Sequence, residues 1–123
     1  MEKEYLYGDI TRRIIKCFYN VYDELGNGFL ESVYEKALMI ELKEIGVKCV
    51  NQQSLNVFYK QQLIGDFIAD IIVEEKIIVE VKAIAKLTPK HEAQIINYLK
   101  ATGIKLGLLV NFGEELEFKR RIF

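Results

Sequence analysis

The sequence predicts an α/β fold in which a central mixed sheet is flanked by helices, and three observations lead to this prediction. Apolar residues recur at helical spacing in residues 9–25, 30–45 and 88–102. Residues 66–82 form two apolar stretches around a polar turn, which is the pattern of a β-hairpin. The continuous apolar run 106–112 follows the third helical segment, and such runs are typical of strands buried on both faces and joined through a helical crossover.

Composition restricts the class of protein. A chain of 123 residues, 50% of them hydrophobic, is expected to form one domain over residues 1–123 without disulfides or a structural metal. The net charge of −1 creates no global basic field, so any nucleic-acid binding must depend on a local patch. Cys17 and Cys49 are isolated and His91 is the only histidine, which argues against a zinc site and suits the reducing cytoplasm. Met1–Tyr5 resembles no targeting segment and no apolar run is long enough to span a membrane, so we expect a cytoplasmic protein without membrane contact.

The first two helices have recognisable ends. Asp9 is the expected N-cap of the first helix, and Gly26 is its expected end. The second helix begins near Leu30, with Glu31 in its first turn and Tyr34 on the same side. A glutamate that complements the helix dipole and a tyrosine packed in the core are ordinary explanations for these two residues.

The middle of the chain predicts a three-stranded antiparallel meander. Short strands are expected at residues 47–50 and 55–59, on either side of the polar stretch 51–54. A turn at residues 60–62 leads into the hairpin of residues 66–82, so consecutive strands would pair with each other.

The third helix and the last strand complete the pattern. Thr88 is the expected N-cap, and the apolar stripe is expected to include Ala93, Ile96 and either Leu99 or Ile95. Gln94 and Tyr98 are four residues apart and therefore share one face of this helix, as a surface amide and a packed aromatic would. The final strand, residues 116–123, carries three basic side chains of the kind that protect a sheet edge: Lys119, Arg120 and Arg121.

The hairpin brings charged residues together in a specific register. If Val73 pairs with Ile77 across the turn, Asp70 lies opposite Glu80 on the same face. Lys82 is two residues further along and within reach of both carboxylates.

Two interpretations of this cluster remain open. The same alternation assigns Ala69 and Ile71 to the opposite, apolar face, so Asp70, Glu80 and Lys82 are expected in a partly covered sheet, where charges are costly unless they are paired or bind a ligand. One interpretation is a cross-strand ion pair between Lys82 and a carboxylate. The other is a hard-cation site, because converging carboxylate oxygens are what Mg²⁺ or Mn²⁺ requires.

Four motifs in order carry a resemblance to a known family. Asp70 and the run Glu80-Val81-Lys82 lie in the meander that follows the helices. Residues 28–34 read Gly-x-x-Glu-x-x-Tyr, residues 94–98 read Gln-x-x-x-Tyr, and residues 109–113 precede a basic strand. This arrangement resembles the PD-(D/E)XK, or restriction-endonuclease-like, nuclease core. The second motif resembles the one that names the GxxExxY family, and the third resembles the QxxxY motif of RecB-like nucleases. Ala69 stands where many members have proline.

The resemblance implies a metal site. Asp70 and Glu80 would hold Mg²⁺ (or Mn²⁺), with the backbone carbonyl of Val81 as a third ligand. Glu31 would enter from the second helix as an additional acidic residue at the metal or its water shell.

The resemblance also implies roles for three other residues. Lys82 would position the attacking water and stabilise its hydroxide form, and Gln94 and Tyr98 would orient the lysine or a substrate phosphate. These roles match the needs of metal-assisted phosphodiester hydrolysis.

The functional prediction is therefore a metal-dependent nuclease that hydrolyses phosphodiester bonds of DNA. The alternative is a catalytically inactive module of the nuclease fold that binds nucleic acid or a protein partner, and a purely structural ion-pair network is the third possibility. A homodimer is expected only by analogy with other small nucleases.

Overall fold

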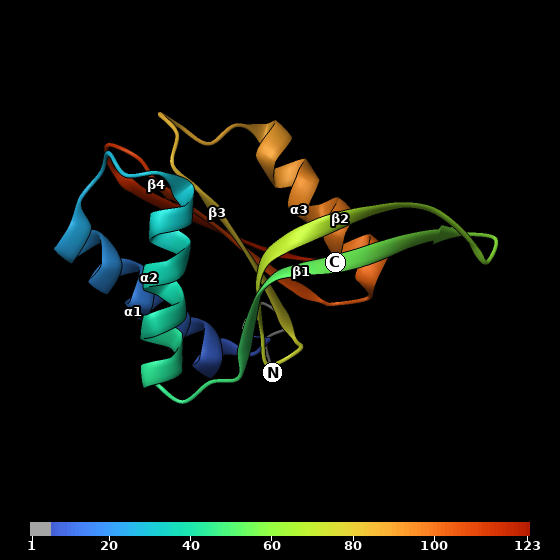
Figure 1. Cartoon of the computed structure of the whole chain (residues 1–123), viewed down its shortest axis with the longest axis horizontal. Coiled ribbons are helices and arrows are strands. Elements are labelled where there is room, and N and C mark those ends of the chain that lie inside the picture. Colours follow the sequence, from blue (N-terminus) through green and yellow to red (C-terminus); the bar gives the residue numbers. More distant parts are fainter. Residues whose placement is uncertain (1–5) are drawn as a thin grey trace.

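A computed structural model describes residues 6–123, and within this range it contains three helices and a five-stranded sheet (Figure 1). The elements are α1 (Gly8–Leu25), α2 (Glu31–Glu44), β1 (Cys49–Tyr59), β2 (Gln62–Val73), β3 (Ile77–Lys82), α3 (Pro89–Thr102), β4 (Leu106–Phe112) and β5 (Leu116–Ile122). Among these residues no helix is both long enough and apolar enough to cross a membrane. The expectation about Met1–Tyr5 concerns residues outside the described range.

The sheet is mixed, as the sequence predicts. Its strand order is β1-β2-β3-β4-β5, and every neighbouring pair is antiparallel except β3 and β4, which are parallel. The crossover between these two strands is α3, so the meander and the helical crossover are both confirmed.

The sheet lies between two helical layers (Figure 1). Residues of α1 and α2 pack on one face against Ile77, Val79 and Val81, whereas Ile78 packs on the other face against Leu99 of α3. All seven residues of β4 are buried, which follows from its position between the two layers. The predicted alternation along the second hairpin strand is confirmed.

The predicted break in β1 is wrong. Residues 51–54 continue the strand, because their backbone pairs with β2 although their side chains are polar. Gln52 has a left-handed backbone conformation (φ 52°), and it lies opposite Asp70 at a gap in the β1–β2 pairing.

This irregularity also corrects the predicted faces of β2. Ala69 packs in one cluster with Ile72 and Leu99, whereas Ile71 faces α1 and α2. Strict alternation would place Ala69 with Ile71. The change of face on β2 coincides with the left-handed residue Gln52, which lies opposite Asp70 on β1.

The helix ends match the prediction at α3 and at Gly26, where α1 ends, but the start of α1 differs. Thr88 is the N-cap of α3, where its backbone N–H and the Nδ1 atom of His91 are 3.0 Å apart in a capping box. The N-cap of α1 is Tyr7 rather than Asp9, which lies in the first turn and pairs with Arg12. Ala93 is exposed, so it does not belong to the predicted stripe of α3, whose buried residues are Ile95 and Leu99.

Candidate active site

The β2–β3 hairpin opens at the two predicted carboxylates. The last paired residues are Ile71 and Val79, in the register predicted from the turn. Beyond them the Glu80 carboxylate accepts a hydrogen bond from the backbone N–H of Asp70 (3.0 Å). The Asp70 carboxylate accepts one from the N–H of Val81 (2.8 Å). The two acidic side chains thus take the places of ladder hydrogen bonds where the strands separate, and we call this place, with Asp70 and Glu80, the fork.

Burial makes this pair costly to ionise. Glu80 is only 5% exposed, and burial, followed by the charge of Asp70, raises its pKa to about 8. Burial also raises the pKa of Asp70, although the hydrogen bond from Val81 and the charge of Lys82 act in the opposite direction. A bound cation would relieve the repulsion between the two carboxylates.

Lys82 lies at the end of β3 and is half-buried. Its positive charge lowers the pKa values of both Asp70 and Glu80 against the effect of burial. It nevertheless forms no ion pair with any residue in the range 6–123. The interpretation of the cluster as a cross-strand ion pair is therefore wrong, and the ammonium group is not committed to a protein carboxylate.

Helix α3 contributes Tyr98 to the margin of the site. Its ring stacks on Phe67 of β2, with centroids 3.9 Å apart and an angle of 9° between the planes. Burial raises the pKa of Tyr98, and the charges of Glu80 and Asp70 add to this effect. The hydroxyl group therefore lies within the field of the two carboxylates, and Gln94, one turn earlier, is its neighbour on α3.

Glu35 of α2 is a site residue that the sequence analysis missed. Its side chain is buried, with only 8% exposed, and its carboxylate accepts hydrogen bonds from Nδ2 of Asn51 (3.1 Å) and Nε2 of Gln52 (2.7 Å). The same Gln52 nitrogen lies 3.5 Å from Oδ1 of Asp70, and the charge of Glu35 contributes to the raised pKa of Glu80. Its position four residues after Glu31, on the same face of α2, was the available signal.

The motif that contains Glu31 divides into an exposed acid and a buried aromatic. Glu31 is exposed and forms no hydrogen bond or ion pair between side chains of residues 6–123, so its role at the metal stays a prediction. The hydroxyl of Tyr34 donates to the carbonyl of Gly26 (2.6 Å) and accepts from the N–H of Phe29 (3.2 Å). Its ring stacks on Phe112 of β4, with centroids 4.5 Å apart. Tyr34 therefore connects the turn before α2, through its hydroxyl group, to β4, through its ring.

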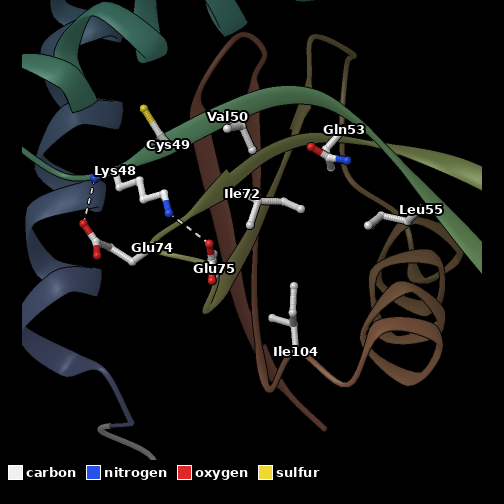
Figure 2. A pocket seen from close by; sticks show the side chains of 9 residues that line it. All are labelled: Lys48, Cys49, Val50, Gln53, Leu55, Ile72, Glu74, Glu75 and Ile104. Carbon is white, nitrogen blue, oxygen red and sulfur yellow. Dashed lines mark hydrogen bonds and ion pairs between the residues drawn. The ribbon is translucent and has the colours of Figure 1, made fainter.

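A separate pocket is lined by none of these residues. It has a volume of about 300 Å³, and Figure 2 shows its lining side chains beside the start of β1. The lining is largely apolar, with an ion pair between Lys48 and Glu75 at its rim (3.0 Å). Neither Asp70 nor Glu80 lines this pocket, so the candidate catalytic carboxylates do not belong to it.

Comparison with known proteins identifies the family. A family model described as the PD-(D/E)XK nuclease superfamily matches residues 8–122. The chain belongs to the PD-(D/E)XK nuclease superfamily. The assignment of Asp70, Glu80 and Lys82 to the acidic pair and the lysine of the superfamily name stays a prediction from the sequence.

A solved structure shows the same fold. The structure titled "Crystal structure of SSO0001" is similar to this PD-(D/E)XK protein with a TM-score of 0.61 and 16% sequence identity, over 74% of this chain and 48% of that one. This chain therefore spans about half the length of the solved protein, and the likeness concerns the fold alone. No curated protein matches the sequence.

Proposed function

We propose that this protein is a nuclease that depends on a divalent metal, Mg²⁺ or Mn²⁺, and hydrolyses phosphodiester bonds of DNA. The observation that carries the proposal is the meeting of Asp70 and Glu80 at the opening of the hairpin, beside a lysine without an ion-pair partner among the described residues. Superfamily membership supports nuclease-type activity. Residues 28–34 support a place in the GxxExxY family within it.

The donor set suits a magnesium-like ion. Within residues 6–123 no three His, Cys, Asp or Glu side chains form a metal cluster, so the site offers two carboxylates rather than a complete cage. Mg²⁺ commonly keeps several waters and uses one or two carboxylates, which fits this set. Asp70 and Glu80 would hold the ion with the backbone carbonyl of Val81. When bound, it would activate water and neutralise charge on the phosphate.

The remaining side chains would act on the water and the substrate. Because Lys82 has no carboxylate partner in residues 6–123, its ammonium can orient the attacking water or contact a phosphate oxygen. Tyr98 and Gln94 would donate hydrogen bonds to the phosphate from α3. Glu35 would act as a positioning residue, because it holds Gln52 beside Asp70.

Metal binding and cleavage should be measured on the same samples. We expect calorimetric titration with Mn²⁺ to show binding by the wild type and none by a variant that combines Asp70→Ala with Glu80→Ala. Plasmid nicking should be lost in the same variant. Metal binding without cleavage of any DNA would favour a nuclease-fold binding module, and absence of metal binding would contradict the site itself.

The lysine provides a sharper test. Lys82→Met should retain Mn²⁺ binding but lose cleavage by a factor on the order of 10² or more, because it removes a group that acts on the reacting atoms. Lys86→Met is the matched control, since this exposed lysine lies four residues beyond the site and should leave both properties unchanged. Equal losses in the two variants would indicate a general charge effect rather than a role for Lys82.

A further inference from the structure

The distal part of the β1–β2 hairpin extends away from the body of the molecule. We call residues 54–68 the arm. In Figure 1 it projects beyond the rest of the sheet and ends in a turn at Lys60 and Gln61. The pairing between β2 and β3 covers only residues 71–73 of β2, so the arm is a two-stranded ribbon. Such ribbons are only marginally stable in water without further packing.

The arm exposes an unusual amount of apolar surface. Its exposed apolar side chains are Phe58 (61%), Tyr59 (62%), Leu63 (59%), Ile64 (64%) and Ile68 (53%). Since a large apolar side chain presents roughly 150–250 Å² when fully exposed, these five leave on the order of 500 Å² uncovered. This lies near the upper end of what soluble monomers expose as one patch.

The edge strand of the arm also lacks the usual protection. β1 is the first strand of the sheet, and Cys49–Tyr59 contains no charged residue and no proline. The opposite edge, β5, carries Lys119, Arg120 and Arg121. Sheet edges that must stay unpaired are normally blocked by charges, proline or a covering segment. The β5 edge therefore carries charges that oppose pairing with another strand, whereas the β1 edge carries none.

We propose that the arm is a self-association surface, on which a second copy of this chain pairs its β1 edge and covers the apolar side chains. Antiparallel pairing of two identical strands is two-fold symmetric, so each copy supplies the same surface. About 500 Å² of apolar side chain, with the flanking amides, approaches the roughly 800 Å² that each partner buries in a standard interface. The only charges of the arm, Lys60 and Asp66, are opposite in sign and create no net repulsion between copies.

The same features disfavour nucleic acid as the occupant. Affinity for nucleic acid comes mainly from lysine and arginine contacts to phosphates, and the arm has a single lysine, Lys60. The proposal does not depend on catalysis, because association through the arm requires neither the metal nor the carboxylates at the fork.

Sedimentation velocity on the full chain tests the proposal. We expect the wild type to show a concentration-dependent dimer over about 1–100 µM. A variant combining Phe58→Lys with Ile64→Lys should be monomeric over the same range. The matched control combines Ile40→Lys with Ile122→Lys, which are exposed apolar residues of α2 and β5, and it should dimerise like the wild type. Circular dichroism would establish that both variants are folded.

Hydrogen exchange on the wild type gives a second readout that requires no substitution. Raising the protein concentration should slow exchange of the β1 amides that face away from β2, while amides of α1 and α3 exchange at unchanged rates. A monomeric wild type, or a dimer that persists in the arm variant, would overturn the proposal. A monomer whose arm variant loses only DNA binding would overturn it in favour of a nucleic-acid contact.

Discussion

At the scale of single residues, Glu80 combines deep burial with a neighbouring carboxylate, and both raise its pKa from 4.5 to about 8. The folded chain therefore binds this proton more tightly than the unfolded chain does, and unfolding releases it at pH values between these two pKa values. The contribution of the Glu80 proton to the stability of the metal-free protein should consequently be fully present below about pH 4.5 and should be lost as the pH rises through about 8.

Glu80→Gln isolates this contribution. The amide cannot ionise, so in metal-free buffer the variant should be more stable than the wild type by a few kcal/mol near pH 8, and the difference should shrink near pH 5. Urea unfolding with a chelator at both pH values measures it. Glu115→Gln, in the exposed turn before β5, is the control and should follow the wild-type profile. Parallel profiles for Glu80→Gln and the wild type would contradict the assigned cause.

The same scale shows what the sequence could reveal of the site. Asp70, Glu80 and Lys82 were predictable because the turn length fixes the hairpin register and the register fixes which side chains meet. Glu35 was not, because its role depends on the packing of α2 against β1. Its partner Gln52 lay in a stretch whose polar composition indicated a loop.

At the scale of elements, the helices and β4 could be predicted from the sequence, whereas the middle of β1 could not. The helices and β4 were predictable because burial imposes a period or a continuous apolar run on them. Residues 51–54 of β1 carry no such signal, because they are exposed and are held extended by pairing with β2. The change of face on β2 coincides with the left-handed backbone of Gln52, a conformation that composition does not encode.

The packing of α3 on β4 yields a prediction at this scale. A Cβ atom on Gly107 would lie 2.7 Å from Cδ1 of Ile95, so Gly107→Ala must displace the helix or the side chain. We expect a loss of about 1–3 kcal/mol in the free energy of unfolding, as for other overpacked cores. Urea unfolding at neutral pH provides the measurement.

A second substitution tests whether the helix contact is responsible. Ile95→Ala removes both the Cδ1 atom and the Cγ1 atom, which would lie 2.9 Å from the added Cβ, so combining it with Gly107→Ala should be less destabilising than the sum of the two single changes. Gly65→Ala is the control, because a Cβ atom there has no other atom within 4 Å, and it should change stability little. Additive losses at positions 107 and 95 would show that the cost arises elsewhere.

At the scale of the whole molecule, the candidate site lies where the β1–β2 hairpin separates from β3. Residues of α2 and of α3, which lie on opposite faces of the sheet, contribute to it. Its carboxylates come from β2 and β3, its buried glutamate from α2 and its tyrosine from α3. A ligand that bridges the two carboxylates would therefore stabilise contacts among all these elements, so its binding should appear in global unfolding.

Metal binding should accordingly raise the stability of the whole fold in a pH-dependent way. At a free Mn²⁺ concentration of about 100 times Kd, a ligand specific for the folded state adds about 2.7 kcal/mol to the free energy of unfolding. Because Glu80 must lose its proton to coordinate the ion, and its pKa is about 8, the rise in melting temperature should be larger near pH 8 than near pH 5. Thermal unfolding with and without Mn²⁺ at both pH values measures this. The variant that combines Asp70→Ala with Glu80→Ala should show no rise at either pH, and an equal rise in that variant would place the metal outside the fork.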